Sequence, residues 1–125
     1  MQIKHIGLVS VPVKDQDVAK SFYVDVLGFN VIMDGPFNRG ARWIMLTPKG
    51  AETAITLVTW FPQMAPGSCQ GLLFEVDDVV AAHAELAARG VKVNALDNAP
   101  WGAYFTFNDP DGNGLVMRQS PGRGG

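Results

Sequence analysis

Few side chains in this sequence of 125 residues are of the types that perform chemistry. Histidine occurs only at His5 and His83, and Cys69 is the single cysteine. An imidazole titrates near pH ~6.5, which suits His5 either for acid–base work in a pocket or for a hydrogen bond to a neighbour at a partly buried position. His83 falls between the polar and core-facing positions of a predicted helix, and we interpret it as structural. The serines follow no nucleophile-elbow pattern, and glycine-rich phosphate-binding fingerprints are absent.

Aromatic side chains are the second group that indicates a function. A buried core accounts for roughly half of them, because large rings dominate the packing of a small domain. The others could line a concave surface and stack on a flat or extended apolar ligand. The aromatic residues in or beside the strands predicted after the helices are Phe37, Trp43, Trp60, Phe61, Trp101 and Tyr104.

Composition narrows the class of protein. Hydrophobic residues make up 47% and charged residues 18%, which is a globular profile. The net charge of -2 and the scattered Lys and Arg residues give no electrostatic reason to expect a nucleic-acid partner. A lone cysteine fits a reducing compartment, and neither a signal-peptide core nor an apolar run of ~20 residues is present. We therefore expect a cytoplasmic protein with no membrane partner.

The first half of the chain predicts a strand, a helix and three further strands. Residues 2–12 alternate loosely and are rich in Ile, Val and Leu, which indicates a strand that ends at Pro12. Apolar residues then recur every four positions, and Gly28 can adopt the left-handed conformation that ends a helix. Short strand-like runs follow at 29–34, 41–47 and 53–60.

The second half predicts the same order of elements. Leu72–Val76 reads as a strand, Asp77 or Asp78 can cap the next helix, and Gly90 can end it. Between the last two strands lies DPDGN, Asp109–Asn113, whose residues we interpret as turn formers. The predicted strands are 91–96, 102–107 and 114–119.

The two halves form a repeat. The segment VAKSFYVDVLGFNV matches VAAHAELAARGVKV, and the period is about 65 to 70 residues. We predict a single domain over residues 1–120, with module one at about 1–61, module two at about 69–120, and a flexible tail at 121–125. The fold class is α+β, with two β-α-β-β-β modules. Because one helix covers one face of each sheet, the free faces could curve together into a cup for a small ligand.

Three segments together resemble the vicinal oxygen chelate family of glyoxalases, extradiol dioxygenases and bleomycin-resistance proteins. They are KHIGLVSVPVKDQDVAKSFYVDVLGF, LLFEVDDVVAAHAELAARGVKV and WGAYFTFNDPDGNGLVMRQ, which span nearly the whole chain. The resemblance implies paired modules, often in a homodimer, with a site inside each cup. Trp101 and Gly102 resemble the bleomycin-resistance branch, which lacks the metal ligands.

The resemblance also implies four positions for ligands to a divalent ion, and this sequence retains one of the four ligands. The positions fall on His5, Thr56, Gly71 and Val116. Glycine and valine have no donor atom, and a neutral hydroxyl is a poor ligand for Zn²⁺, Ni²⁺ or Fe²⁺. Glu75 shares a strand face with Gly71, but His5 and Glu75 would be only two ligands. We therefore expect no metal and no other cofactor.

Strand alternation extends these positions to neighbouring side chains of the cup, namely Val58, Trp60, Leu73, Glu75 and Arg118. In this fold type the first and last strands of a module are neighbours, so Glu75 and Arg118 can face each other. Either they form a cross-strand ion pair, or the planar fork of Arg118 binds an anionic ligand group.

Three hypotheses follow. The first is a metal-free protein that sequesters an aromatic or amphiphilic compound, for example an antibiotic, as a homodimer. The second is a glyoxalase-like lyase, isomerase or dioxygenase that uses a metal ion, or His5 or Glu75 as a general base. The third is an interaction module without a ligand. The predicted ligand-binding residues are His5, Trp43, Thr56, Val58, Trp60, Leu73, Trp101, Tyr104, Val116 and Arg118.

Overall fold

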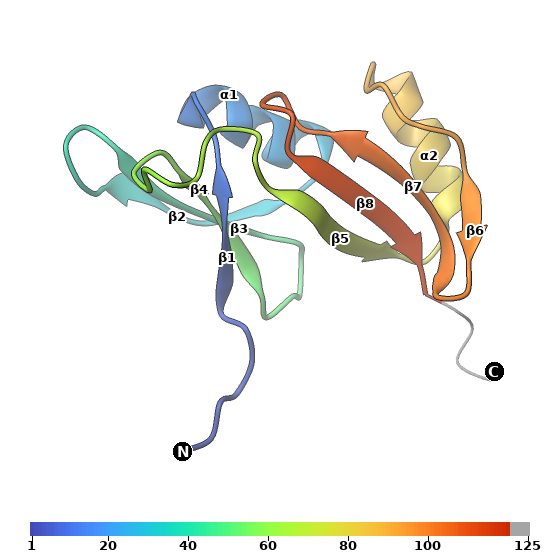
Figure 1. Ribbon diagram of the computed structural model, residues 1–125, viewed down its shortest axis with the longest axis horizontal. Coiled ribbons are helices and arrows are strands. Elements are labelled where there is room, and N and C mark those ends of the chain that lie inside the picture. The colour runs from blue at the N-terminus through green and yellow to red at the C-terminus, as the bar shows by residue number, and fades with distance from the viewer. Residues whose placement is uncertain (121–125) are drawn as a thin grey trace.

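Each half of the chain forms a four-stranded mixed sheet in the computed structural model, which describes residues 1–120 (Figure 1). The predicted tail at 121–125 lies outside the described residues. The first sheet has the order β1-β4-β3-β2 and the second β5-β8-β7-β6. Strand β1 runs parallel to β4, and β5 runs parallel to β8, whereas the other neighbours are antiparallel. The strands are β1 Leu8–Pro12, β2 Asn30–Pro36, β3 Arg42–Thr47, β4 Ala54–Val58, β5 Gln70–Val76, β6 Asp97–Ala99, β7 Gly102–Asn108 and β8 Gly114–Gln119.

The helices begin and end where their capping residues predict. The Asp15 carboxylate accepts two backbone N–H groups at the start of α1, Gln16–Ser21. This helix continues directly into a π-helical turn, η1, at Phe22–Val26, and Gly28 follows with φ of 81°. Helix α2, Val79–Ala88, is capped by Asp78 and followed by Gly90 with φ of 85°. The α+β class and the repeated order of elements are therefore confirmed.

Two predicted strands are shorter than expected because each needs a partner edge. The strand predicted at 2–12 begins only at Leu8, opposite the first residue of β4, and residues 1–7 are exposed. The strand predicted at 91–96 contributes one isolated bridge, from Val93 to Phe107, and β6 pairs with β7 just after it. No helix within residues 1–120 is long and apolar enough to cross a membrane.

The core lies on the sheet faces that meet the helices. Ile44 and Leu57 of the first sheet and Leu115 of the second are fully buried, as is Tyr23 of η1. One buried cluster contains side chains from both modules, and Phe29 packs edge-on against Phe74 across the boundary, with ring centroids 5.3 Å apart. On the opposite face of the first sheet, Thr56 and Val58 are buried as well, whereas Trp43 is partly exposed.

Candidate ligand-binding site

The register of the strands assigns the predicted side chains to two separate faces. In the first sheet Thr56 of β4 lies between Ser10 of β1 and Met45 of β3. In the second sheet Arg118 of β8 lies between Glu75 and Tyr104. We call the residues Trp43, Thr56, Val58 and Trp60 the first-sheet face, and the residues Leu73, Glu75, Trp101, Tyr104, Val116 and Arg118 the second-sheet face.

An aromatic cluster of Phe37, Trp43, Trp60 and Phe61 stands on the first-sheet face. The indole rings of Trp43 and Trp60 lie 6.0 Å apart with an interplanar angle of 23°, and Phe37 packs 4.7 Å from Trp60. The Phe61 ring lies 6.1 Å from Trp60. Phe37 and Phe61 are 51% and 45% exposed, so the cluster is only partly used for packing. Such half-exposed rings can stack on a flat ligand.

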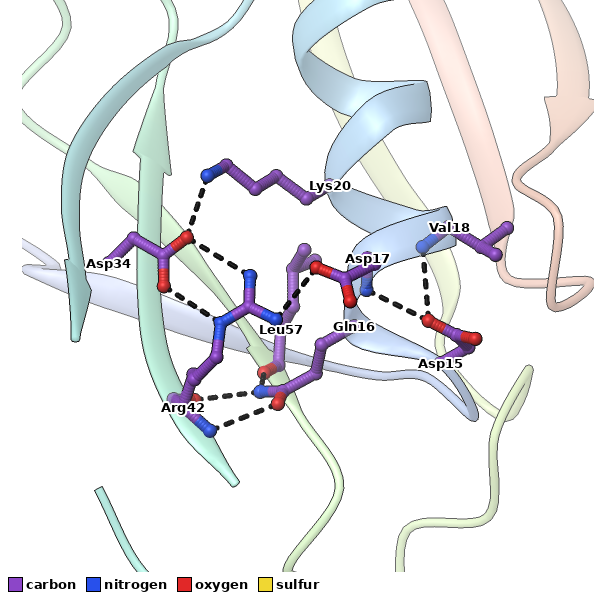
Figure 2. A network of polar contacts seen from close by, with 8 residues as sticks. All are labelled: Asp15, Gln16, Asp17, Val18, Lys20, Asp34, Arg42 and Leu57. Carbon is purple, nitrogen blue, oxygen red and sulfur yellow. Dashed lines mark hydrogen bonds and ion pairs between the residues drawn. The ribbon is translucent and has the colours of Figure 1, made fainter. Parts of the chain in front are cut away.

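A polar network fixes the hairpin that carries Phe37 (Figure 2). Asp34 of β2 accepts hydrogen bonds from Arg42 of β3 at 3.0 Å and from Lys20 of α1 at 2.6 Å, and Arg42 also reaches Asp17 at 2.7 Å. The hydrogen bonds from Arg42 and Lys20 hold the pKa of Asp34 well below its usual range. The network therefore ties both strands of the β2–β3 hairpin to α1.

Gln16 of α1 forms a second connection to the sheet, which the sequence did not predict. Its side-chain amide donates to the carbonyl oxygens of Arg42 and Leu57, and its oxygen accepts the N–H of Arg42 at 3.0 Å. The loop between β2 and β3 lines a hollow of about 360 Å³ that is open to solvent. Because the hairpin base is held at several points, Phe37 keeps its place beside the two tryptophans.

The second-sheet face combines an ion pair with two aromatic rings. Glu75 pairs with Arg118, as one of the two sequence interpretations predicted, and the pair is half open to solvent at Glu75. Arg118 Nη1 donates to the carbonyl oxygen of Trp101 at 3.2 Å. Trp101, in the β6–β7 turn, lies 4.5 Å from the Tyr104 ring. Val116 and the half-exposed Leu73 lie opposite one another in the same sheet.

His5 is not brought to either face within the described chain. It precedes β1 and is exposed, and the β1 residue next to Thr56 is Ser10. His83 bonds through Nε2 to the carbonyl of Asn94 at 2.9 Å and packs edge-on against Phe105. The structural interpretation of His83 is therefore confirmed, whereas the site role of His5 stays a prediction.

The donor atoms do not fit the metal site of related enzymes. Within residues 1–120 no three His, Cys, Asp or Glu side chains lie close enough to hold an ion. Gly71 has φ of 83° at an irregularity of β5, a conformation that disfavours any side chain there. Thr56 and Val116 belong to different sheets. Whether the chain binds a metal ion stays a prediction.

The two faces lie far from each other along the molecule. Figure 1 shows the β2–β3 hairpin at one end of the long axis and the β6–β7 hairpin at the other. An apolar hollow of about 310 Å³ is lined by residues of both modules, among them Val9 of β1, Ile55 of β4 and Phe74 of β5, and it includes Leu73 and Glu75 of the second-sheet face. This hollow contains no member of the aromatic cluster.

Comparison with known proteins places these features in context. The model of the Glyoxalase/Bleomycin resistance protein/Dioxygenase superfamily matches residues 2–117. The crystal structure of TnmS3, an antibiotic binding protein from Streptomyces sp. CB03234, has 50% sequence identity and a TM-score of 0.93, covering 97% of this chain and 99% of that one. A glyoxalase/bleomycin resistance protein from the same strain has 49% identity and a TM-score of 0.83, covering 92% and 100%. The uncharacterized protein YetH of Bacillus subtilis (strain 168) is 36% identical, covering 94% and 99%.

Proposed function

Because the chain belongs to the glyoxalase/bleomycin resistance protein/dioxygenase superfamily, we propose that it is a metal-free binding protein that sequesters a flat aromatic or amphiphilic small molecule. The observation that carries this proposal is the half-exposed aromatic cluster on the first-sheet face. The likeness to TnmS3, an antibiotic binding protein, supports the binding of a small molecule.

The second element of the proposal is a homodimer. The second-sheet face carries its own rings, Trp101 and Tyr104, at the other end of the long axis from the aromatic cluster. A ligand sandwiched by both faces therefore needs the first-sheet face of one copy and the second-sheet face of another. A two-fold dimer contains two such sites, because symmetry makes each copy contribute its first-sheet face to one site and its second-sheet face to the other.

The binding test uses 2-naphthol and its saturated analogue decahydro-2-naphthol. The full-length protein is titrated with each compound, and the resonances of the tryptophan indole N–H groups are followed by NMR. We expect 2-naphthol to bind with a Kd below about 1 mM and the saturated alcohol to bind at least about tenfold more weakly, because only the flat ring can stack. Absence of binding by 2-naphthol would contradict the proposal.

Metal loading is expected to stay below about a tenth of an ion per chain after incubation with Ni²⁺, Zn²⁺, Mn²⁺ or Fe²⁺ and desalting. The reason is the donor set, since Thr56, Gly71 and Val116 occupy the positions where related enzymes carry ligands. Elemental analysis measures the ratio, and His5→Ala is the control. A stoichiometric ion that is lost in His5→Ala would instead favour the glyoxalase-like enzyme.

A further inference from the structure

Two buried side-chain atoms within residues 1–120 have no hydrogen-bond partner, Oγ1 of Thr56 and Nε of Arg118. A buried polar atom without a partner destabilises a fold, so such atoms are rare and need an explanation. One of the two belongs to the first-sheet face and the other to the second-sheet face. Both faces of the proposed site thus carry one unsatisfied group, which is the pattern expected where a ligand supplies the missing partners.

Thr56 occupies the middle of the first-sheet face. It is 1% exposed and lies on the central strand β4, with Ser10 and Met45 as its register neighbours. None of these neighbours carries a charge. Met45 is unbranched and therefore adapts its shape more readily than a branched neighbour would. A threonine hydroxyl both donates and accepts, so it suits a neutral oxygen of the ligand.

The buried donor of Arg118 without a partner is the N–H of Nε. One of its terminal nitrogens pairs with Glu75, the other donates to the carbonyl of Trp101, and the buried Nε–H is left. Because Glu75 already balances the positive charge, the Nε–H suits a neutral oxygen better than a second carboxylate. The adjacent rings of Trp101 and Tyr104 would hold the aromatic body of the same ligand.

We propose that the ligand is a flat aromatic compound with a neutral oxygen at each of two separate edges, one bonded to Oγ1 of Thr56 in one copy of the chain and the other accepting from Nε of Arg118 in the second copy of the proposed dimer. This inference rests on the proposed aromatic-binding function and specifies its chemistry. It makes Thr56 and Arg118 the residues that select oxygenated aromatic ligands over plain hydrocarbons.

The test compares 2,6-dihydroxynaphthalene with naphthalene, which differ only by the two oxygens. The unmodified protein should bind the dihydroxy compound at least about tenfold more tightly, the effect of about 1.4 kcal/mol of hydrogen bonding. In Thr56→Val the preference should fall to about threefold, because the hydroxyl is replaced by a methyl group of similar size. Thr56→Ser keeps the hydroxyl and should keep the preference.

Thermal unfolding without ligand supplies a second readout that a structural role would not give. Thr56→Val removes a buried hydroxyl that has no partner, so its Tm should rise by about 4 °C. A hydroxyl that served the fold would instead make the variant less stable. The signature of the proposal is therefore a variant that is more stable and less selective.

The outcomes separate this inference from the proposed function. If both naphthalenes bind the unmodified protein equally well, the two-oxygen ligand is wrong while aromatic binding stands. If neither compound binds, the proposed function fails together with the inference. A lower Tm in Thr56→Val, or an unchanged preference for the dihydroxy compound, overturns the role of Thr56.

Discussion

Dimers that pair a Trp43→Ala chain with a Trp101→Ala chain are expected to bind 2-naphthol at about half of their sites, although neither variant binds well alone. In the proposed dimer each site takes the first-sheet face from one copy and the second-sheet face from the other. A mixed dimer then has one site with both faces intact and one site with both faces damaged. Each variant alone has one damaged face in every site.

The size of the loss follows from the packing of the two rings. Trp43 contacts Trp60 in the aromatic cluster, and Trp101 lies against Tyr104. Truncating a tryptophan at the centre of a binding surface costs at least about 2 kcal/mol, or about 30-fold in affinity. In the mixed dimer, the intact site should therefore bind 2-naphthol with the affinity of the unmodified protein, and the damaged site should bind it much more weakly.

The experiment uses two affinity tags to isolate the mixed dimer after the chains are exchanged, followed by the NMR titration. The matched control pairs Trp43→Ala with Trp60→Ala, which damages the first-sheet face of both copies and should recover nothing. If the site formed within one chain, the Trp43 and Trp101 mixture would also recover nothing. That result would leave aromatic binding possible but remove the shared site.

Local signals in the sequence were sufficient to predict most of the fold. Asp15 and Asp78 cap the two helices, and Gly28 and Gly90 follow them in the left-handed conformation, as their residue types predict. The limits of the first strand could not be predicted in this way. Residues 2–7 have the composition of a strand, but strand formation requires a partner edge, and β4 begins opposite Leu8.

The candidate site was only partly predictable for the same reason. Alternation placed Glu75 and Arg118 on the inner faces of their strands, because the period of two is a local property of a strand. That the two strands are neighbours came from the family resemblance, and the register confirms that Glu75 lies opposite Arg118. Counting from a family pattern assigned both His5 and Thr56 to ligand positions of one site, and the β1 residue that lies opposite Thr56 is Ser10. The distance between the two faces depends on how the sheets pack, which periodicity does not encode.

The DPDGN segment forms the predicted turn, but it also makes contacts with the first module that the sequence did not predict. Asp109 was interpreted as a turn former, and its Oδ1 does accept the N–H groups of Asp111 and Asn113 at 2.9 Å. The same carboxylate is 5% exposed and accepts the hydroxyl of Tyr23 from the other module at 2.8 Å. Asn113 also donates to the carbonyl of Pro12 in the first module. The two ends of the turn, Asp109 and Asn113, therefore form a buried connection between the modules.

Replacing Asp109 by alanine is expected to lower the free energy of unfolding by about 3–4 kcal/mol, because buried donors lose a charged acceptor. The donors are the Tyr23 hydroxyl, the Asn113 side-chain amide and two backbone N–H groups. Burial, together with the nearby Asp109 charge, raises the pKa of Tyr23 well above its usual range, so the hydroxyl stays a donor at any physiological pH. In a packed core these donors cannot form hydrogen bonds to water in place of the lost carboxylate.

Urea unfolding followed by tryptophan fluorescence measures the effect, and Asp111→Ala is the matched control from the same turn. The Asp111 carboxylate accepts the backbone N–H of Lys14 at 2.9 Å in an exposed position, so its loss should cost less than about 1 kcal/mol. Equal losses in the two variants would show that the buried contacts of Asp109 add nothing to the connection between modules. A much larger loss in Asp109→Ala would show that the buried contacts of this carboxylate stabilise the connection between η1 of the first module and the last turn of the second.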